Sequence, residues 1–290
     1  MKTSESIFLP VRGINYHVRT WGDPQAPKVF LLHGSQDVSA AWQFTVDAMR
    51  GDWYFLAPDW RGFGLSDWGG GQSYWQPDYV ADLHQILERF SPGEPALLMT
   101  HSLGGNIASV YGGLKPDRVR KFINVEGYNV PSVPVEHSGK RYSLWLENTA
   151  REDKAPRSYP SYEAFAERMR KSNPRLNAER ALFLAQHWCK EAPGGGVMLR
   201  ADPAHGRSSP ISYRLDEQLS YWKRITAPTL WVEGGQSDWL HILLKSGEYE
   251  LRKAAIRDLT FERFENAAHN IHHEEPERLA QVCESFLLRP

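Results

Sequence analysis

Residues 96–108 read ALLMTHSLGGNIA, and the rest of the chain is interpreted around this stretch. The apolar run at 96–99 is long enough for one buried strand and too short for a helix. The residues from Asn106 onward read as the start of a helix. Between them, Ser102 stands at an abrupt strand-to-helix turn with a glycine two positions later, which is the arrangement of a nucleophile elbow. Such a turn lifts the hydroxyl out of the sheet and points the backbone N–H of Leu103 at any oxyanion formed there.

A plainer interpretation of Ser102 is also available, because serine is a preferred helix N-cap. The elbow pattern usually begins with a glycine, and Thr100 holds that position here. We therefore expect a local adjustment where the strand and the helix run close. Gly104 and Gly105 favour close packing of the helix on the strand, since neither carries a Cβ. The motifs in the rest of the chain decide between the two interpretations.

Length and composition restrict the class of protein. A chain of 290 residues fits one large α/β domain, or a core domain with a smaller insertion. The formal net charge of −1 gives no indication of a nucleic-acid or membrane-surface partner. The N-terminus lacks an apolar signal region and no apolar run approaches the length of a membrane span, so we expect a cytoplasmic protein. The cysteines Cys189 and Cys283 match no metal or redox spacing.

Short apolar runs alternate with helical segments through residues 1–130 and again through 220–290. Strands are expected at 7–10, 14–19, 29–32, 54–58, 96–99, 120–125, 229–232 and 259–264, and helices at 40–49, 77–90, 242–253 and 276–288. This alternation predicts an α/β fold with a mostly parallel sheet and helices on both faces.

Residues 131–219 have a different character, with no convincing central strand. Amphipathic helical stretches at 141–150, 162–171 and 178–191 are joined by Pro- and Gly-rich breaks, with a short extended piece at 197–200. We predict a mostly helical cap over the sheet, inserted into a core made of residues 1–130 and 220–290.

Five motifs occur along the chain in a fixed order. They are His33-Gly34, the loop carrying Asp59, Arg61 and Ser66, the elbow at Ser102, the strand and Gly234 before Asp238, and His269 followed by Glu275-Pro276. With these motifs the chain resembles an α/β-hydrolase with a helical cap, in which the nucleophile, the acid and the histidine follow in that order. The resemblance covers nearly the whole chain apart from the cap, and it leaves the substrate open.

The resemblance implies a catalytic triad of Ser102, His269 and Asp238. His269 would take the proton of the serine hydroxyl, and Asp238 would orient the imidazole and stabilise its charged form. Glu126 remains an alternative acid, because it ends the strand after the nucleophile helix and some relatives supply the acid from there. We favour Asp238 because Gly235-x-x-Asp238 has the usual spacing.

The remaining candidate residues lie around this triad. The backbone N–H groups of Ser35 and Leu103 would form the oxyanion hole. Candidates for the substrate pocket are Gly34, Trp60, His101 and Trp239. The run from His272 to Glu275 resembles a metal cluster in composition only, since adjacent residues at a helix start diverge by about 100° each. We interpret it as a solvated helix start and expect no metal.

The expected reaction is hydrolysis of a carboxylic ester or related acyl bond through an acyl-Ser102 intermediate, without a cofactor. The substrate would be a small apolar or aromatic molecule, because the cap is rich in aromatic residues. Two alternatives stay open: carbon–carbon bond hydrolysis by the same three residues, and a non-enzymatic ligand-binding module on the same fold. A small-molecule substrate is the expected partner, with no nucleic acid and no membrane, and the chain would be a monomer or a dimer.

Overall fold

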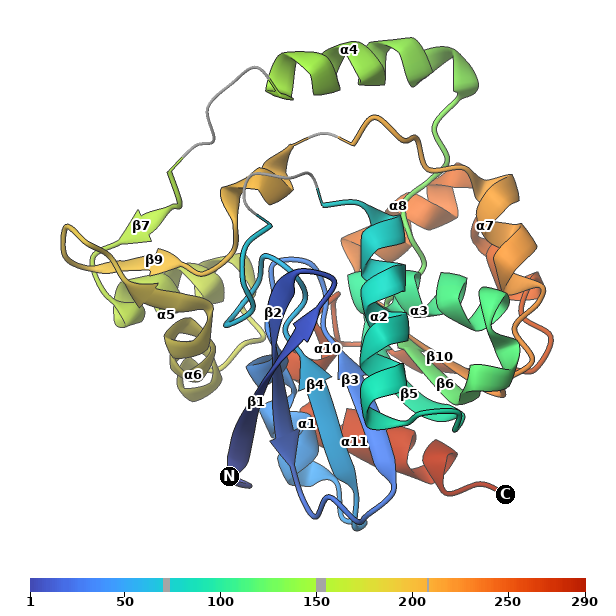
Figure 1. The fold of residues 1–290 in the computed structure, drawn as a ribbon, viewed down its shortest axis with the longest axis horizontal. Coiled ribbons are helices and arrows are strands. Elements are labelled where there is room, and N and C mark those ends of the chain that lie inside the picture. Colours follow the sequence, from blue (N-terminus) through green and yellow to red (C-terminus); the bar gives the residue numbers. More distant parts are fainter. Residues whose placement is uncertain (70–73, 150–154, 208) are drawn as a thin grey trace.

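The computed structural model describes residues 1–69, 74–149, 155–207 and 209–290, and its centre is one eight-stranded sheet (Figure 1). The strand order is β1-β2-β4-β3-β5-β6-β10-β11. The strands are β1 (Ser4–Val11), β2 (Ile14–Trp21), β3 (Lys28–Leu32), β4 (Tyr54–Pro58), β5 (Ala96–His101), β6 (Val119–Val125), β10 (Thr229–Gly234) and β11 (Leu259–Phe264). β2 pairs antiparallel with β1 and with β4, and every pair from β4 to β11 is parallel. The predicted α/β class and mostly parallel sheet are confirmed.

Helices cover both faces of this sheet, which is why β4, β5 and β10 are buried along their whole length. One face carries α1 (Gln43–Ala48) and α11 (Pro276–Leu287), which pack against each other. The other face carries α2 (Gln76–Phe90), α3 (Leu103–Leu114) and α7 (Leu215–Trp222), as Figure 1 shows. Two apolar clusters result, one on each side of the strands.

The stretch predicted to form a cap, residues 131–219, lies between β6 and β10. Its elements are α4 (Ser138–Thr149), β7 (Ser158–Tyr159), α5 (Tyr162–Ser172), α6 (Ala178–Trp188), β8 (Cys189–Glu191) and β9 (Val197–Leu199). The helix expected at 141–150 corresponds to α4, and residue 150 lies outside the described residues. β7, β9 and β8 form a small separate sheet. The extended piece expected at 197–200 corresponds to β9, whereas β8 occupies the last three residues of the helix expected at 178–191.

The helix expected at 242–253 is two helices, α8 (Asp238–Ser246) and α9 (Tyr249–Ala254). Gly247 ends α8 in the left-handed conformation, with φ +74°, which glycine adopts without steric conflict. At the other end, the Ser237 hydroxyl accepts from the backbone N–H of Leu240, so α8 begins four residues earlier than expected. None of the helices in the described ranges is long and apolar enough to cross a membrane.

Candidate active site

Ser102 alone makes the turn between β5, which ends at His101, and α3, which begins at Leu103. Its backbone has φ +47° and ψ −113°, a conformation that residues other than glycine rarely adopt. The Ser102 N–H donates to the Val125 carbonyl at 2.9 Å, and its carbonyl accepts from Asn106 at 3.0 Å. The neighbouring strand and the new helix therefore hold the strained turn, and Ser102 stays half-buried at the carboxyl edge of the sheet.

The first turn of α3 lies close to the strands beneath it. A Cβ added to Gly104 would lie 2.3 Å from a backbone carbonyl oxygen of β3, and one added to Gly105 would lie 2.2 Å from Asn124 Oδ1. Thr100, at the position of the family's first glycine, is fully buried, and its hydroxyl donates to the Ile123 carbonyl at 2.9 Å. The extra side chain of Thr100 is thus accommodated by a hydrogen bond to β6.

Three side chains from different strand ends form one hydrogen-bonded series. Ser102 Oγ lies 3.0 Å from His269 Nε2, and His269 Nδ1 lies 2.8 Å from Glu126 Oε2. A carboxylate only accepts hydrogen bonds, so the proton of the neutral imidazole is on Nδ1 and the lone pair is on Nε2. This arrangement leaves Nε2 ready to accept the proton of the Ser102 hydroxyl.

Glu126 is 2% exposed and directly follows β6, with a backbone φ of +57°. Besides His269, its carboxylate accepts from the Ser237 hydroxyl and from the Gly234 N–H, both at 2.6 Å, and from the Tyr128 hydroxyl. Burial and the adjacent carboxylate hold the pKa of Tyr128 well above its usual value, so this phenol remains a donor. Four donors stabilise the ionised carboxylate away from water.

The prediction that Asp238 is the acid is wrong. Asp238 is the exposed first residue of α8, and the hydrogen-bond partner of His269 Nδ1 is Glu126. The residue that the loop after β10 turns inward is Ser237, whose hydroxyl donates to the Glu126 carboxylate. Glu126 was the alternative, and the signal for it is an acid placed immediately after a buried parallel strand.

The two amides expected to form the oxyanion hole lie on either side of Ser102. Ser35 is in the turn after β3, and Leu103 is the first residue of α3. A Cβ added to Gly34 would lie 3.1 Å from Ser102 Cβ, so the turn after β3 lies directly against the elbow. Among the described residues, neither the Ser35 nor the Leu103 N–H has a hydrogen-bond acceptor. The start of α3 adds the positive end of its dipole.

Two of the pocket candidates lie in very different surroundings. The Trp239 side chain is 44% exposed, and its ring centroid lies 6.3 Å from that of His269. Trp60 is fully buried: its indole N–H donates to the His33 carbonyl at 3.0 Å, and its backbone N–H donates to His33 Nε2 at 2.9 Å. Trp60 therefore belongs to the core, and its prediction as a pocket residue is wrong.

Histidines next to the elbow form a buried cluster. His101 lies beneath the turn, and its Nε2 donates to the His269 carbonyl at 2.9 Å. His272 and His273, expected to be solvated, are 0% and 2% exposed. Their Nε2 atoms lie 2.9 and 3.3 Å from Asp37 Oδ2. The prediction of a solvated helix start is thus wrong, because the loop after β3 places a carboxylate against it.

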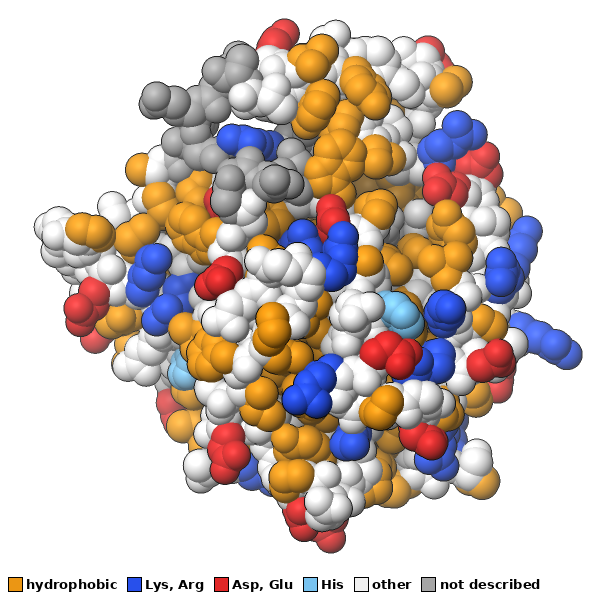
Figure 2. All heavy atoms as spheres, viewed as in Figure 1, with side chains coloured by type: hydrophobic (Ala, Val, Ile, Leu, Met, Phe, Trp, Pro, Cys, Tyr) orange, Lys and Arg blue, Asp and Glu red, His pale blue; other side chains and the backbone are white. Residues whose placement is uncertain are grey.

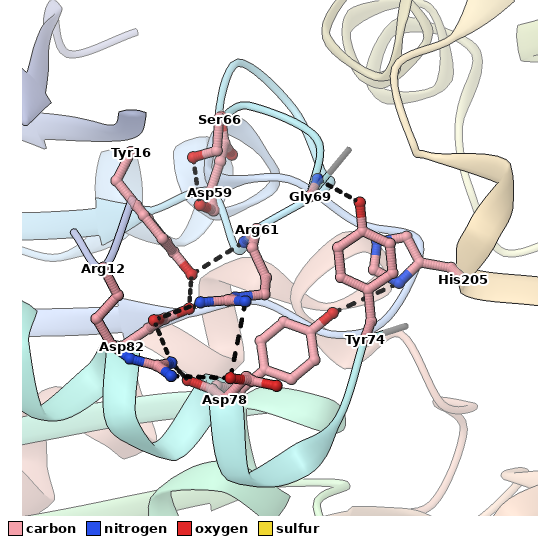
Figure 3. Close-up of polar contacts among 11 residues, drawn as sticks. Arg12, Tyr16, Asp59, Arg61, Ser66, Gly69, Tyr74, Asp78, Asp82 and His205 are labelled. Atoms are coloured by element: carbon pink, nitrogen blue, oxygen red, sulfur yellow. Dashed lines mark hydrogen bonds and ion pairs between the residues drawn. The ribbon is translucent and has the colours of Figure 1, made fainter. Parts of the chain in front are cut away.

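A second polar network fixes the loop after β4. Asp59 accepts from His17 Nδ1 at 2.7 Å and from the Ser39 N–H at 2.6 Å. Burial raises the pKa of Asp59, but the hydrogen bond and the charge interaction with His17 help to lower this pKa to about 2. Arg61 donates to both oxygens of Asp82 at 2.5 and 2.7 Å, as Figure 3 shows. Asp59 is thus bonded to β2 and to the turn at Ser39, and Arg61 is bonded to α2, so both residues stabilise the shape of the site.

Comparisons with known proteins agree with this architecture. A family model described as the alpha/beta hydrolase fold matches residues 27–276. A serine hydrolase-like protein of Danio rerio is 28% identical over 99% of this chain and 90% of its own. Serine hydrolase-like protein 2 of Homo sapiens is 22% identical over 93% of this chain and 89% of its own.

Solved structures share the fold at lower sequence identity. A thioesterase domain from the curacin biosynthetic pathway superposes with a TM-score of 0.83 at 23% identity, covering 97% of this chain and 99% of that one. An esterase of Mycobacterium tuberculosis gives 0.73 at 20% identity, covering 98% and 91%. The family expected from the motifs is confirmed, and the chain belongs to the alpha/beta hydrolase fold family.

Proposed function

We propose that this protein is a serine hydrolase that cleaves carboxylic esters, or related acyl bonds, of a small molecule. The observation that carries the proposal is the series Ser102 Oγ–His269 Nε2–Glu126 Oε2, with separations of 3.0 and 2.8 Å along it. Serine is a weak nucleophile until a base removes its proton, and this series supplies the base and the group that orients it.

Each step of the proposed reaction is assigned to a residue of the site. Ser102 Oγ attacks the carbonyl carbon while its proton passes to His269 Nε2, and Glu126 stabilises the imidazolium that results. The N–H groups of Ser35 and Leu103 donate to the oxyanion. His269 then gives its proton to the leaving alcohol, which leaves an acyl-Ser102 ester. Water repeats the sequence, with His269 as the base, and releases the acid.

A small cavity beside Gln36, which follows Ser35 in the chain, supports a small apolar acyl group. A cavity of about 60 Å³ lies where the loop after β3 meets the cap; Gln36, Val38, Phe63, Phe165, Trp188 and Leu199 are among its lining residues. Its walls are mostly apolar, so burying a short hydrocarbon there is favourable by the hydrophobic effect. The cap also presents exposed apolar side chains on α4, among them Tyr142 and Leu146, and Figure 2 shows orange side chains gathered at the top of the view.

The test is turnover of short p-nitrophenyl esters by purified protein and by Ser102→Ala. We expect hydrolysis by the unaltered protein and loss of at least about a thousandfold in kcat for the variant. Ser220→Ala is the matched control, because that hydroxyl is exposed on α7 and donates to the Glu217 carbonyl of its own helix. Full turnover by Ser102→Ala would remove Ser102 from the mechanism. A ring-cleavage diketone run in parallel tests carbon–carbon bond hydrolysis.

A further inference from the structure

A group of metal-ligating side chains lies beneath the elbow and has no part in the proposed reaction. Within the described ranges, Asp37, His101 and His272 each offer a ligand atom, and these three atoms all lie within 4.8 Å of one another. Their side chains come from the loop after β3, the end of β5 and α10 (Ile271–Glu274). All three residues are at least 97% buried, with exposed fractions of 3%, 2% and 0%.

Hydrogen bonding leaves this group with more lone pairs than protons. His101 Nε2 donates to the His269 carbonyl, so Nδ1 of the neutral ring has a lone pair, and this buried atom has no partner among the residues that the structure describes. His272 Nε2 donates to Asp37 Oδ2 at 2.9 Å, and its Nδ1 is likewise buried without a partner. A bound cation would accept the ring lone pairs for which this cluster has no hydrogen-bond donor.

We propose that Asp37, His101 and His272 form a binding site for a divalent transition-metal ion of the zinc class. Two imidazoles and one carboxylate are ligands that suit zinc and its neighbours, and three protein ligands leave a fourth position for water. The proton on His272 Nε2 moves to the free Nδ1, and Nε2 and Asp37 Oδ2 then bind the ion. His101 adds Nδ1 and keeps its hydrogen bond to the His269 carbonyl.

The required movement is small. A tetrahedral zinc with bonds of about 2.0–2.1 Å places its ligand atoms about 3.3 Å apart. The 2.9 Å separation of Asp37 Oδ2 from His272 Nε2 therefore opens slightly, and His101 moves inward. Asp37 also lines the 60 Å³ cavity between the core and the cap. The other carboxylate oxygen, Oδ1, is held by the indole N–H of Trp188 at 3.0 Å.

An ion at this site would act on the proposed reaction, and this consequence rests on the proposed function. The His101 ring lies 4.9 Å from the His269 ring, centroid to centroid. A dication next to His101 disfavours the imidazolium that His269 must become when it takes the proton of Ser102. We expect saturating zinc to lower ester hydrolysis at least about tenfold, and a chelator to restore it.

The binding test uses zinc alone in equilibrium dialysis of the full chain, with the bound metal counted per chain. We expect one zinc for the unaltered protein, and a dissociation constant at least about tenfold higher for His272→Gln and for Asp37→Asn. His241→Gln is the matched control, since that histidine is exposed on α8. Binding that persists in His269→Gln separates this site from one built on the triad.

A buried substitution can unfold the chain, so a second measurement uses unaltered protein. Cobalt(II) takes the place of zinc, and its visible absorption reports the ligands around it. We expect the intense band of a four-coordinate ion with nitrogen and oxygen ligands. The proposal is overturned by a spectrum of six-coordinate, water-like cobalt, by zinc binding no tighter in the unaltered protein than in His272→Gln, or by loss of binding in His269→Gln. None of these outcomes depends on whether the protein hydrolyses esters.

Discussion

Replacing Glu126 by glutamine tests which acid serves His269. Glutamine has the same shape, and its carbonyl oxygen can still accept from Gly234 and Tyr128 at the positions that Glu126 Oε1 occupies. The amide NH₂ then faces His269 Nδ1, where it donates instead of accepting. The imidazole must therefore put its proton on Nε2, and it can no longer accept the proton of Ser102.

The size of the effect follows from the charge that is lost. Glu126 is 2% exposed, and its carboxylate lies 2.8 Å from Nδ1. At an effective dielectric constant of about 20, a negative charge roughly 4 Å from the centre of an imidazolium stabilises it by about 4 kcal/mol. This corresponds to a loss of about a thousandfold in kcat, and the wrong tautomer adds to it.

The assay is the steady-state hydrolysis of a short p-nitrophenyl ester by Glu126→Gln, with Asp238→Asn as the matched control. Asp238 is exposed and its side chain has no part in the series to Ser102, so we expect its variant to stay within about twofold of the unaltered protein. Equal losses in the two variants, or a larger loss in Asp238→Asn, would refute the assignment of Glu126.

Three further predictions concern the support of the site. Tyr128→Phe removes one donor to the Glu126 carboxylate, and we expect kcat to fall about tenfold with KM unchanged; an unchanged kcat would contradict this. Gly104→Ala forces a Cβ to 2.3 Å from a carbonyl oxygen, and urea unfolding should show a loss of about 3 kcal/mol or more, whereas a loss under about 1 kcal/mol would mean that α3 can shift. Asp59 has a folded pKa of about 2 against an ordinary 3.8, so it contributes about 2 kcal/mol that is fully present above pH 3.8 and is lost as the pH falls toward 2. Asp59→Asn should lack this change in unfolding free energy over that pH interval, and a variant as acid-sensitive as the unaltered protein would contradict the assignment.

The order of strands and helices could be predicted because it rests on local patterns. Buried parallel strands are short apolar runs, and the elbow at Ser102 is marked by its own neighbours, Gly104 and Gly105. His269 was identified for the same reason, as the histidine directly after the last strand and its turn. The break between α8 and α9 was missed, although the glycine at 247 marks it, because the apolar period continues across it.

The acid and the histidine cluster could not be predicted in this way. The strands that precede Glu126 and Asp238 end at the same edge of the sheet. The direction of each side chain depends on backbone angles, and sequence spacing does not determine those angles. Glu126 has φ +57°, and its carboxylate reaches His269, while Asp238 is turned outward by the helix that Ser237 caps. The burial of His272 depends on Asp37, a residue 235 positions away.

Trapping the acyl-enzyme tests the central claim most directly. Protein mixed with an excess of a short p-nitrophenyl ester is quenched in acid within the first turnovers, digested, and mapped by mass spectrometry. We predict the acyl group on the peptide that contains Ser102, and no modified peptide in Ser102→Ala. Continued release of p-nitrophenol with no acyl group on that peptide, or with the acyl group on another residue, would contradict the mechanism.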